Sequence, residues 1–292
     1  MKLALGTVQF GLDYGLSNIQ GKTSLDEVES ILDYAATVGI KTLDTAYSYG
    51  DSETTLGNFL QNDNFNVVTK SKLFTNLKEL NKHDSQDLVD TFHASLEKLK
   101  ISSVDGLMIH HVNDLFKTGG DHLYMALESL KEQKLSQKIG VSAYTAKEID
   151  LILDRYNIDI IQLPANIFDQ RLMQSGHLTK LKKAGVEIHV RSAFLQGLVF
   201  LDPRSLSPHF KKYIKHFKSF QEELKYRNLL PETVALGFLA GIEEIDQIIC
   251  GVNNLTQLKD LVRAYTESND FSWVKNFAID DESIINPGNW KI

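Results

Sequence analysis

Residues 138–163, KIGVSAYTAKEIDLILDRYNIDIIQL, contain the pattern that decides the fold. Residues 138–142 and 158–163 are short apolar runs typical of buried strands. Between them, Thr145 and Glu148 have the spacing of a capping box, which begins a helix. The apolar stripe of that helix comprises Ile149, Ile152 and Leu153. A strand, a helix and a second strand in this order predict a parallel β-α-β unit, because parallel strands need a crossover connection.

The same pattern repeats along the chain. We expect eight strands, at Leu3–Leu5, Leu43–Ala46, Phe65–Thr69, Asp105–His111, Lys138–Ser142, Ile158–Leu163, Val186–Ser192 and Gln247–Val252. Eight such units in about 270 residues predict an α/β protein with a closed (β/α)8 barrel, the TIM barrel. The rival is an open doubly wound sheet. No GxGxxG follows the first strand, which disfavours the dinucleotide-binding form of that rival.

Helix signals lie between these strands. Ser24 with Glu27 predicts a second capping box, and Ser85 predicts another helix start. Further helices are expected around residues 123–130 and over residues 255–266.

Two longer segments extend the barrel. Residues 196–246, between the last two strands, have room for one or two extra helices. The segment after Phe271 lacks helical periodicity and is expected to form a tail over the barrel. Since no linker or shift in composition divides the chain, residues 1–292 are expected to form a single domain.

Composition limits the function classes. The chain has 292 residues and a net charge of −7, so no basic excess exists to meet nucleic acid or a membrane surface. The single cysteine, Cys250, permits no intrachain disulfide or paired-cysteine zinc site, and no metal is expected. No apolar run approaches a signal peptide or the roughly 20 residues of a membrane helix, so we expect a cytoplasmic protein. The oligomeric state is not readable.

Polar residues follow successive predicted strands, where barrel enzymes carry their active sites. Asp44, Tyr47 or Tyr49, Lys70, and His110 or His111 are therefore expected to meet at one mouth. A lysine about 4 Å from a tyrosine would lower the phenol pKa by up to about three units, making a usable proton donor. Each residue alone has an ordinary alternative: a turn cap for Asp44, a solvated lysine, an interior histidine or a packed tyrosine. Their joint occurrence indicates chemistry that protonates an oxygen while hydride reaches a carbon.

Several motifs together resemble the aldo-keto reductase family over nearly the whole chain. They are GTVQFG at 6–11, LDTAYSYG at 43–50, VVTK at 67–70, DGLMIHH at 105–111, KIGVSAY at 138–144, IIQLPAN at 160–166, CGVNNLTQLKDL at 250–261 and INPGNW at 285–290. The resemblance implies a (β/α)8 reductase that binds NADPH extended across the barrel mouth, with NADH as an alternative.

The resemblance also implies residue roles. Tyr49 matches the general acid of the family, and Asp44, Lys70 and His110 match its assisting aspartate, lysine and histidine. The implied cofactor-binding residues are Gly6, Thr7, Ser142, Gln162, Arg191, Ser192, Gly251, Asn253, Asn254 and Gln257. Of these, Gly251, Asn253, Asn254 and Gln257 fall where the family holds the adenine end and the 2′-phosphate.

The chain departs from the family pattern at several positions. Ala143 replaces an asparagine, Leu261 replaces another, and His111 stands where tryptophan is common. Arg191 stands where an aromatic residue usually covers the nicotinamide; it could stack on that ring, reach the pyrophosphate, bind an acidic substrate or join a salt bridge. Only Lys259 and Arg263 are available near the expected 2′-phosphate position.

Three functions follow from this pattern. The first is an NAD(P)H-dependent carbonyl reductase acting on a small carbonyl compound, such as a keto-sugar or another polar carbonyl. The second is an NADPH-binding regulatory subunit with little turnover. The third, disfavoured because Asp44 should keep the amine protonated, is a lyase with a Schiff base on Lys70. Candidate pocket aromatics are Phe10, Tyr14, Phe168, Phe194 and Trp273.

Overall fold

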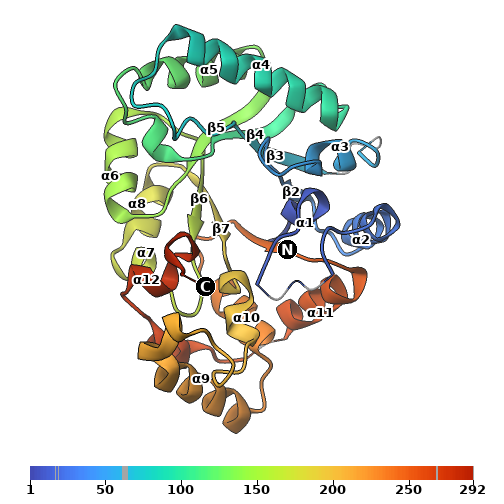
Figure 1. Ribbon diagram of the computed structural model, residues 1–292, viewed down its shortest axis with the longest axis vertical. Coiled ribbons are helices and arrows are strands. Elements are labelled where there is room, and N and C mark those ends of the chain that lie inside the picture. The colour runs from blue at the N-terminus through green and yellow to red at the C-terminus, as the bar shows by residue number, and fades with distance from the viewer. Residues whose placement is uncertain (17, 19, 61–64, 268, 292) are drawn as a thin grey trace.

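The computed structural model describes residues 1–16, 18, 20–60, 65–267 and 269–291. Its strands form a closed parallel barrel in chain order, β1 to β8, surrounded by helices (Figure 1). The predicted (β/α)8 architecture is confirmed. The strands are β1 Leu3–Gly6, β2 Thr42–Asp44, β3 Asn66–Lys70, β4 Val104–Ile109, β5 Ser136–Ser142, β6 Ile160–Pro164, β7 Glu187–Arg191 and β8 Gln247–Gly251.

The barrel closes where β1 pairs with β8, with Leu3 opposite Ile248 and Gly6 opposite Gly251. Lys2 strengthens this seam: its Nζ donates to the carbonyls of Ala240 and Ile242, at 3.2 and 2.8 Å. Its backbone N–H donates to the hydroxyl of Tyr265, 263 positions later in the chain. The two ends of the barrel sequence are therefore tied together.

The helices cover the outside of the barrel. They are α1 Val8–Gly11, α2 Leu25–Thr37, α3 Ser52–Leu56, α4 Lys82–Leu99, α5 Asp121–Glu132, α6 Ala146–Arg155, α7 Arg171–Gln174, α8 His177–Lys183, α9 Ile214–Arg227, α10 Pro231–Ala240, α11 Leu255–Thr266 and α12 Glu282–Ile285. The predicted capping box of α6 forms between Thr145 and Glu148, and Ile149 and Ile152 are buried. Among the described residues, no helix is both long enough and apolar enough to cross a membrane.

One predicted helix start and one predicted capping box are wrong. Helix α4 begins after Asn81, which forms a capping box with Asp84, so Ser85 lies inside the helix. At α2, Ser24 accepts the N–H of Glu27 as predicted, but the Glu27 carboxylate does not close the box. That carboxylate accepts the N–H of Leu255 at the start of α11. Glu27 therefore links the first and last β-α units.

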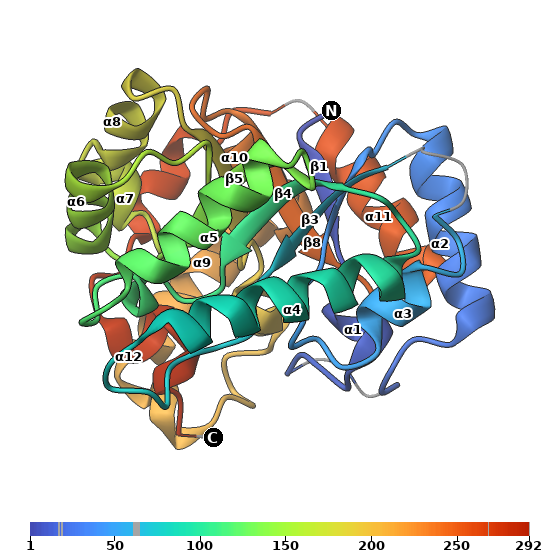
Figure 2. The ribbon, with the colours of Figure 1, turned by 90° about the horizontal axis from the view of Figure 1, so that it is seen from above.

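The segment between β7 and β8 contains α9 in addition to α10, as predicted. Helix α9 packs its buried Phe217 and Phe220 against Phe168, with ring centroids 5.2 and 5.4 Å apart. The tail follows the same surface, where Trp290 contacts Phe210 at 5.1 Å between centroids. Figure 2 shows the two termini at opposite ends of the barrel, with the C-terminus on the side of α1 and α12.

Strand periodicity brings polar side chains to one level. Val68, Met108 and Ile160 form a small apolar cluster apart from the main core. Because side chains two positions apart on a strand share a face, Lys70, His110 and Gln162 lie one layer nearer the carboxyl ends of the strands. This is the barrel end at which (β/α)8 enzymes build their active sites.

Candidate active site

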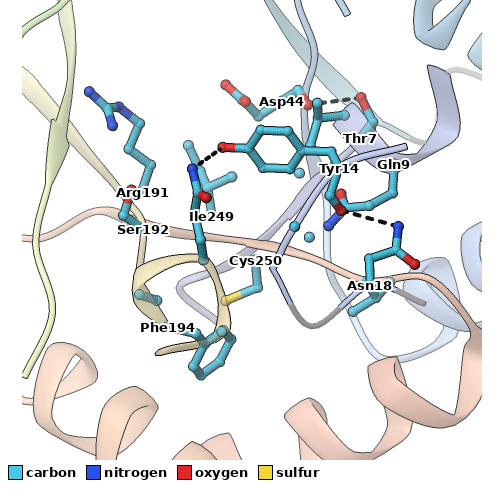
Figure 3. A pocket seen from close by; sticks show the side chains of 18 of the residues that line it. Thr7, Gln9, Tyr14, Asn18, Asp44, Arg191, Ser192, Phe194, Ile249 and Cys250 are labelled. Carbon is cyan, nitrogen blue, oxygen red and sulfur yellow. Dashed lines mark hydrogen bonds between the residues drawn. The ribbon is translucent and has the colours of Figure 1, made fainter. Parts of the chain in front are cut away.

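A cavity of about 660 Å³ opens at the carboxyl end of the barrel (Figure 3). It is lined by most of the predicted site residues: Gly6, Thr7, Asp44, Tyr49, His110, Ser142, Gln162, Arg191, Ser192, Gly251, Asn253 and Gln257. Two predicted residues are not part of this lining. Lys70 is buried beneath it with 1% exposure, and Asn254 caps α11 by accepting the N–H of Gln257.

Lys70 and Asp44 form a buried ion pair at the floor of this site. The Lys70 Nζ lies 2.6 and 2.8 Å from the two carboxylate oxygens of Asp44 and donates a third hydrogen bond, at 3.0 Å, to the carbonyl of Thr45. Gln162 donates its Nε2 to Asp44 at 2.6 Å. Desolvation lowers the pKa of Lys70, and the charge of Asp44 opposes that shift. All three donors of the ammonium group are used, so the pair is rigid.

Tyr49 lies above this pair, with the Lys70 Nζ 5.1 Å from the centroid of its ring. The expectation that Lys70 lowers the pKa of Tyr49 is wrong. Desolvation and the charge of Asp44 raise the pKa of the Tyr49 hydroxyl, and the cation that opposes this shift is Arg191. The reason is geometric: the ammonium lies over the ring and spends its donors on Asp44 and Thr45. The phenol therefore stays protonated and able to donate.

His110 stands edge-on to Tyr49, with ring centroids 5.8 Å apart. Its Nδ1 lies 3.0 Å from the Ser48 hydroxyl. Desolvation, followed by the charges of Lys70 and Arg191, lowers the pKa of His110 to about 3. The imidazole is therefore neutral near pH 7 and can take part in a hydrogen bond without adding charge to the site.

Arg191, at the end of β7, has no ion-pair partner in the described part of the chain. Its guanidinium stacks on Tyr144, with Cζ 4.2 Å from the ring centroid. Its buried Nη2 has no hydrogen-bond partner among the described residues. Figure 3 shows Arg191 on the opposite side of the cavity from Thr7 and Gln9. A salt bridge in the barrel mouth, one of the alternatives for this residue, does not form.

The wall facing Arg191 contains a residue that sequence reasoning missed. Gln9 is 9% exposed, and its buried Oε1 has no partner among the described residues. A Cβ atom placed on Gly251 would stand 2.5 Å from this oxygen, so a larger residue there would force the Gln9 amide to move. The motif GTVQFG contains Gln9, but nothing in its spacing indicates that this side chain faces β8.

Two loops meet over the cavity. The Nε2 of Gln196 donates to the hydroxyl of Tyr14 at 3.1 Å, which joins the loop after β1 to the loop after β7. Gln196 adopts a positive φ of 52°, and Ser192 adopts 62°. Of the candidate pocket aromatics, Tyr14 and Phe194 line the cavity. Phe10, Phe168 and Trp273 are buried in the main core instead.

The far end of the cavity is formed by Asn253, Gln257, Asp260 and Leu261 from β8 and α11. Lys259 and Arg263, the two cations expected there, contact other residues instead. Lys259 lies over the ring of Tyr34, with Nζ 5.6 Å from the centroid, and Arg263 pairs with Asp260 at 2.5 Å. Neither lines the cavity.

Residues 2–276 match the model of the aldo/keto reductase family. The chain belongs to this family. This aldo/keto reductase is similar to the uncharacterized oxidoreductase YqkF of Bacillus subtilis (strain 168), at 24% identity over 90% of both chains. It is also similar to L-galactose dehydrogenase of Arabidopsis thaliana, at 24% identity over 98% of this chain and 92% of that protein.

The family fold also appears among solved structures. The aldo-keto reductase AKR11C1 from Bacillus halodurans, in its holo form, superposes with a TM-score of 0.75. The two share 20% sequence identity over 99% of this chain and 95% of that structure. Membership of the aldo/keto reductase family implies carbonyl reduction with a nicotinamide cofactor.

Proposed function

We propose that this chain reduces an aldehyde or ketone with hydride from a nicotinamide cofactor, with Tyr49 as the proton donor. The observation that carries this proposal is the buried Lys70–Asp44 pair beneath a protonated Tyr49 and a neutral His110. These groups offer a proton and a hydrogen-bonding partner to a carbonyl oxygen. A nucleophilic alternative is weak, because the Lys70 amine is buried, fully bonded and absent from the cavity lining.

The cavity suits an extended dinucleotide. Gly6 and Gly251 are opposite each other in the barrel and leave the cavity wall free of side chains there. The unpaired Oε1 of Gln9 offers an acceptor in the same wall. The residues proposed to hold the cofactor are Gly6, Thr7, Ser142, Gln162, Ser192, Gly251, Asn253 and Gln257, with Asn254 acting by capping α11. When bound, the nicotinamide supplies the hydride.

The proton for the carbonyl oxygen comes from the Tyr49 hydroxyl. As the carbonyl oxygen gains negative charge, the Tyr49 hydroxyl donates its proton and becomes a phenolate. Arg191 is the cation whose charge favours this phenolate, while Asp44 holds Lys70 in place beneath the ring. His110 positions the carbonyl oxygen through a hydrogen bond.

Preference between NADPH and NADH is expected to be small. The family resemblance favours NADPH. No described lysine or arginine other than Arg191 lines the cavity, and its α11 end has Asp260 in the lining and Glu27 at the start of the helix. A 2′-phosphate would therefore meet little compensating charge, and we expect the two dissociation constants to lie within about tenfold of each other.

The experiment combines binding and turnover. Nicotinamide fluorescence is titrated with each cofactor, and a panel of aldehydes and ketones is then screened with the wild type, Tyr49→Phe and Tyr47→Phe. Tyr47 is the matched control, because it lies two positions away and outside the cavity lining. We expect Tyr49→Phe to lower kcat/KM about a thousandfold and Tyr47→Phe to change it less than threefold.

Other outcomes separate the alternatives. Full activity in Tyr49→Phe would contradict the assignment of the proton donor. Tight cofactor binding without turnover of any carbonyl, together with stable association with another protein, would favour the regulatory-subunit function. Failure to bind either cofactor would reject hydride transfer.

A further inference from the structure

Arg191 carries the uncompensated positive charge of the cavity. Lys70 is neutralised by Asp44 at 2.6 Å, and His110 is neutral because its pKa is lowered to about 3. Besides Asp44, the described acidic residues in the lining are Glu232 and Asp260, and neither forms an ion pair with Arg191. Arg191 is therefore the cation of the described cavity lining that no carboxylate pairs with directly.

The guanidinium is also held in a fixed orientation. Tyr144 supports one face at 4.2 Å, and the unpartnered Nη2 is buried. An unsatisfied buried donor on a charged group is costly, so such a group is expected to gain a partner in a bound complex. Its natural partner is a pair of anionic oxygens, because the donors of a guanidinium match a carboxylate or phosphate.

Arg191 lines the same cavity as Tyr49, Tyr14 and His110, and its charge acts on all three groups. An anion bound to it would therefore lie beside the carbonyl that Tyr49 protonates. The adenine end, formed by α11, is at the other extreme of the cavity. This arrangement favours an anion on the substrate over an anion on the cofactor.

We infer that the substrate is a carbonyl compound that carries an anionic group near its carbonyl, and that Arg191 binds this group. This inference rests on the proposed reductase function. A 2-oxo carboxylate is the smallest member of the class. Its carbonyl carbon gains hydride, its carbonyl oxygen gains the Tyr49 proton, and the carboxylate is unchanged. Water reprotonates Tyr49, and the cofactor leaves oxidised.

The test compares acids with their methyl esters, which keep the carbonyl and remove the charge. Phenylglyoxylate and methyl phenylglyoxylate form one pair, and pyruvate and methyl pyruvate form another. The readout is the ratio of kcat/KM for acid over ester in the wild type, Arg191→Met, Arg191→Lys and Arg204→Met. Arg204 is the control, since its side chain is 81% exposed and pairs with Asp202.

We expect the wild-type ratio to exceed about tenfold for at least one pair, and Arg191→Met to reduce it about tenfold or more. Arg191→Lys should restore part of the ratio, and Arg204→Met should not change it. An acid-to-ester ratio near one in the wild type would overturn the inference. A ratio unchanged in Arg191→Met would also overturn it.

The two sources of an anion are separated by binding. Cofactor affinity is measured by fluorescence in the wild type and Arg191→Met. A large loss of cofactor affinity with an unchanged ratio would assign Arg191 to the cofactor pyrophosphate and reject the inference. Titration with benzoate, which cannot be reduced, tests the anion site without turnover. Benzoate that binds the wild type and not Arg191→Met would support the anion site even if the proposed reductase function failed.

Discussion

The floor and the sides of the cavity differ in how completely their polar groups are hydrogen-bonded. On the floor, Lys70, Asp44 and Gln162 bond one another at 2.6 to 2.8 Å. On the sides, Gln9 Oε1 and Arg191 Nη2 are buried and unpartnered among the described residues. The comparison teaches that the floor is preorganised by the fold, whereas the sides present groups whose partners belong to a ligand. Each half of this contrast can be tested.

The largest effect is expected on the floor. Lys70→Met leaves Asp44 buried with a single amide partner, and an uncompensated buried charge costs about 3–5 kcal/mol. We expect the free energy of unfolding in urea to fall by about that amount. The double variant Asp44→Asn with Lys70→Met should recover part of it. The control is Lys22→Met, which breaks an ion pair whose side chains are 44% and 73% exposed, and should cost less than about 1 kcal/mol. If Lys70→Met and Lys22→Met lowered the free energy of unfolding equally, the buried pair would be no more important for stability than the exposed pair.

The next largest effect is the pH dependence of stability that His110 causes. The pKa of His110 is about 3 in the folded protein and near 6.5 when unfolded, so the unfolded state binds more protons between those values. The contribution of His110 to stability is therefore fully present above pH 6.5 and is lost as pH falls toward 3. Between pH 4 and 6, the free energy of unfolding in urea should rise with pH more steeply in the wild type than in His110→Asn. The difference in slope should correspond to about one proton. Parallel slopes would show that His110 is not desolvated.

The smallest effect is expected at the far end. Glu27→Gln removes a negative charge at the start of α11 while keeping a group that accepts the Leu255 N–H. We expect NADPH to gain about two- to fivefold in affinity relative to NADH, in line with a charge at a helix terminus. Asp26→Asn is the control, since it makes the same charge change at an exposed neighbouring position. A ratio of the two dissociation constants that moves equally in both variants would argue that Glu27 acts only through general charge.

The sequence was sufficient for elements that depend on local periodicity. The eight strands, the α6 capping box and a group of Asp44, Lys70, a tyrosine and a histidine at one end of the barrel follow from spacing and from the geometry of parallel barrels. The choice of Tyr49 and His110 within that group came from the family resemblance. The start of α4 did not, because Asn81 and Ser85 are both capable caps. Asn81 is used because Asp84 completes its box.

Features that depend on distant partners escaped sequence reasoning. Glu27 has the spacing of a local capping box, yet its carboxylate bonds Leu255, 228 positions away. The effect of Lys70 on Tyr49 depends on where three ammonium hydrogens point, which residue types do not specify. The unpaired state of Arg191 likewise requires knowing that no carboxylate reaches it in three dimensions.

The seam between β1 and β8 has a consequence for synthesis of the protein. The N–H of Lys2 cannot form its hydrogen bond until Tyr265, 263 positions later, has been synthesised. At 5–20 residues per second, a ribosome needs about 10 to 50 s to make that stretch. Throughout this interval β1 has one edge without its final neighbour, and an open edge invites pairing with other chains. Closure is therefore an event of the nearly finished chain, and a pause in translation before β8 would lengthen the period in which nascent chains need a chaperone.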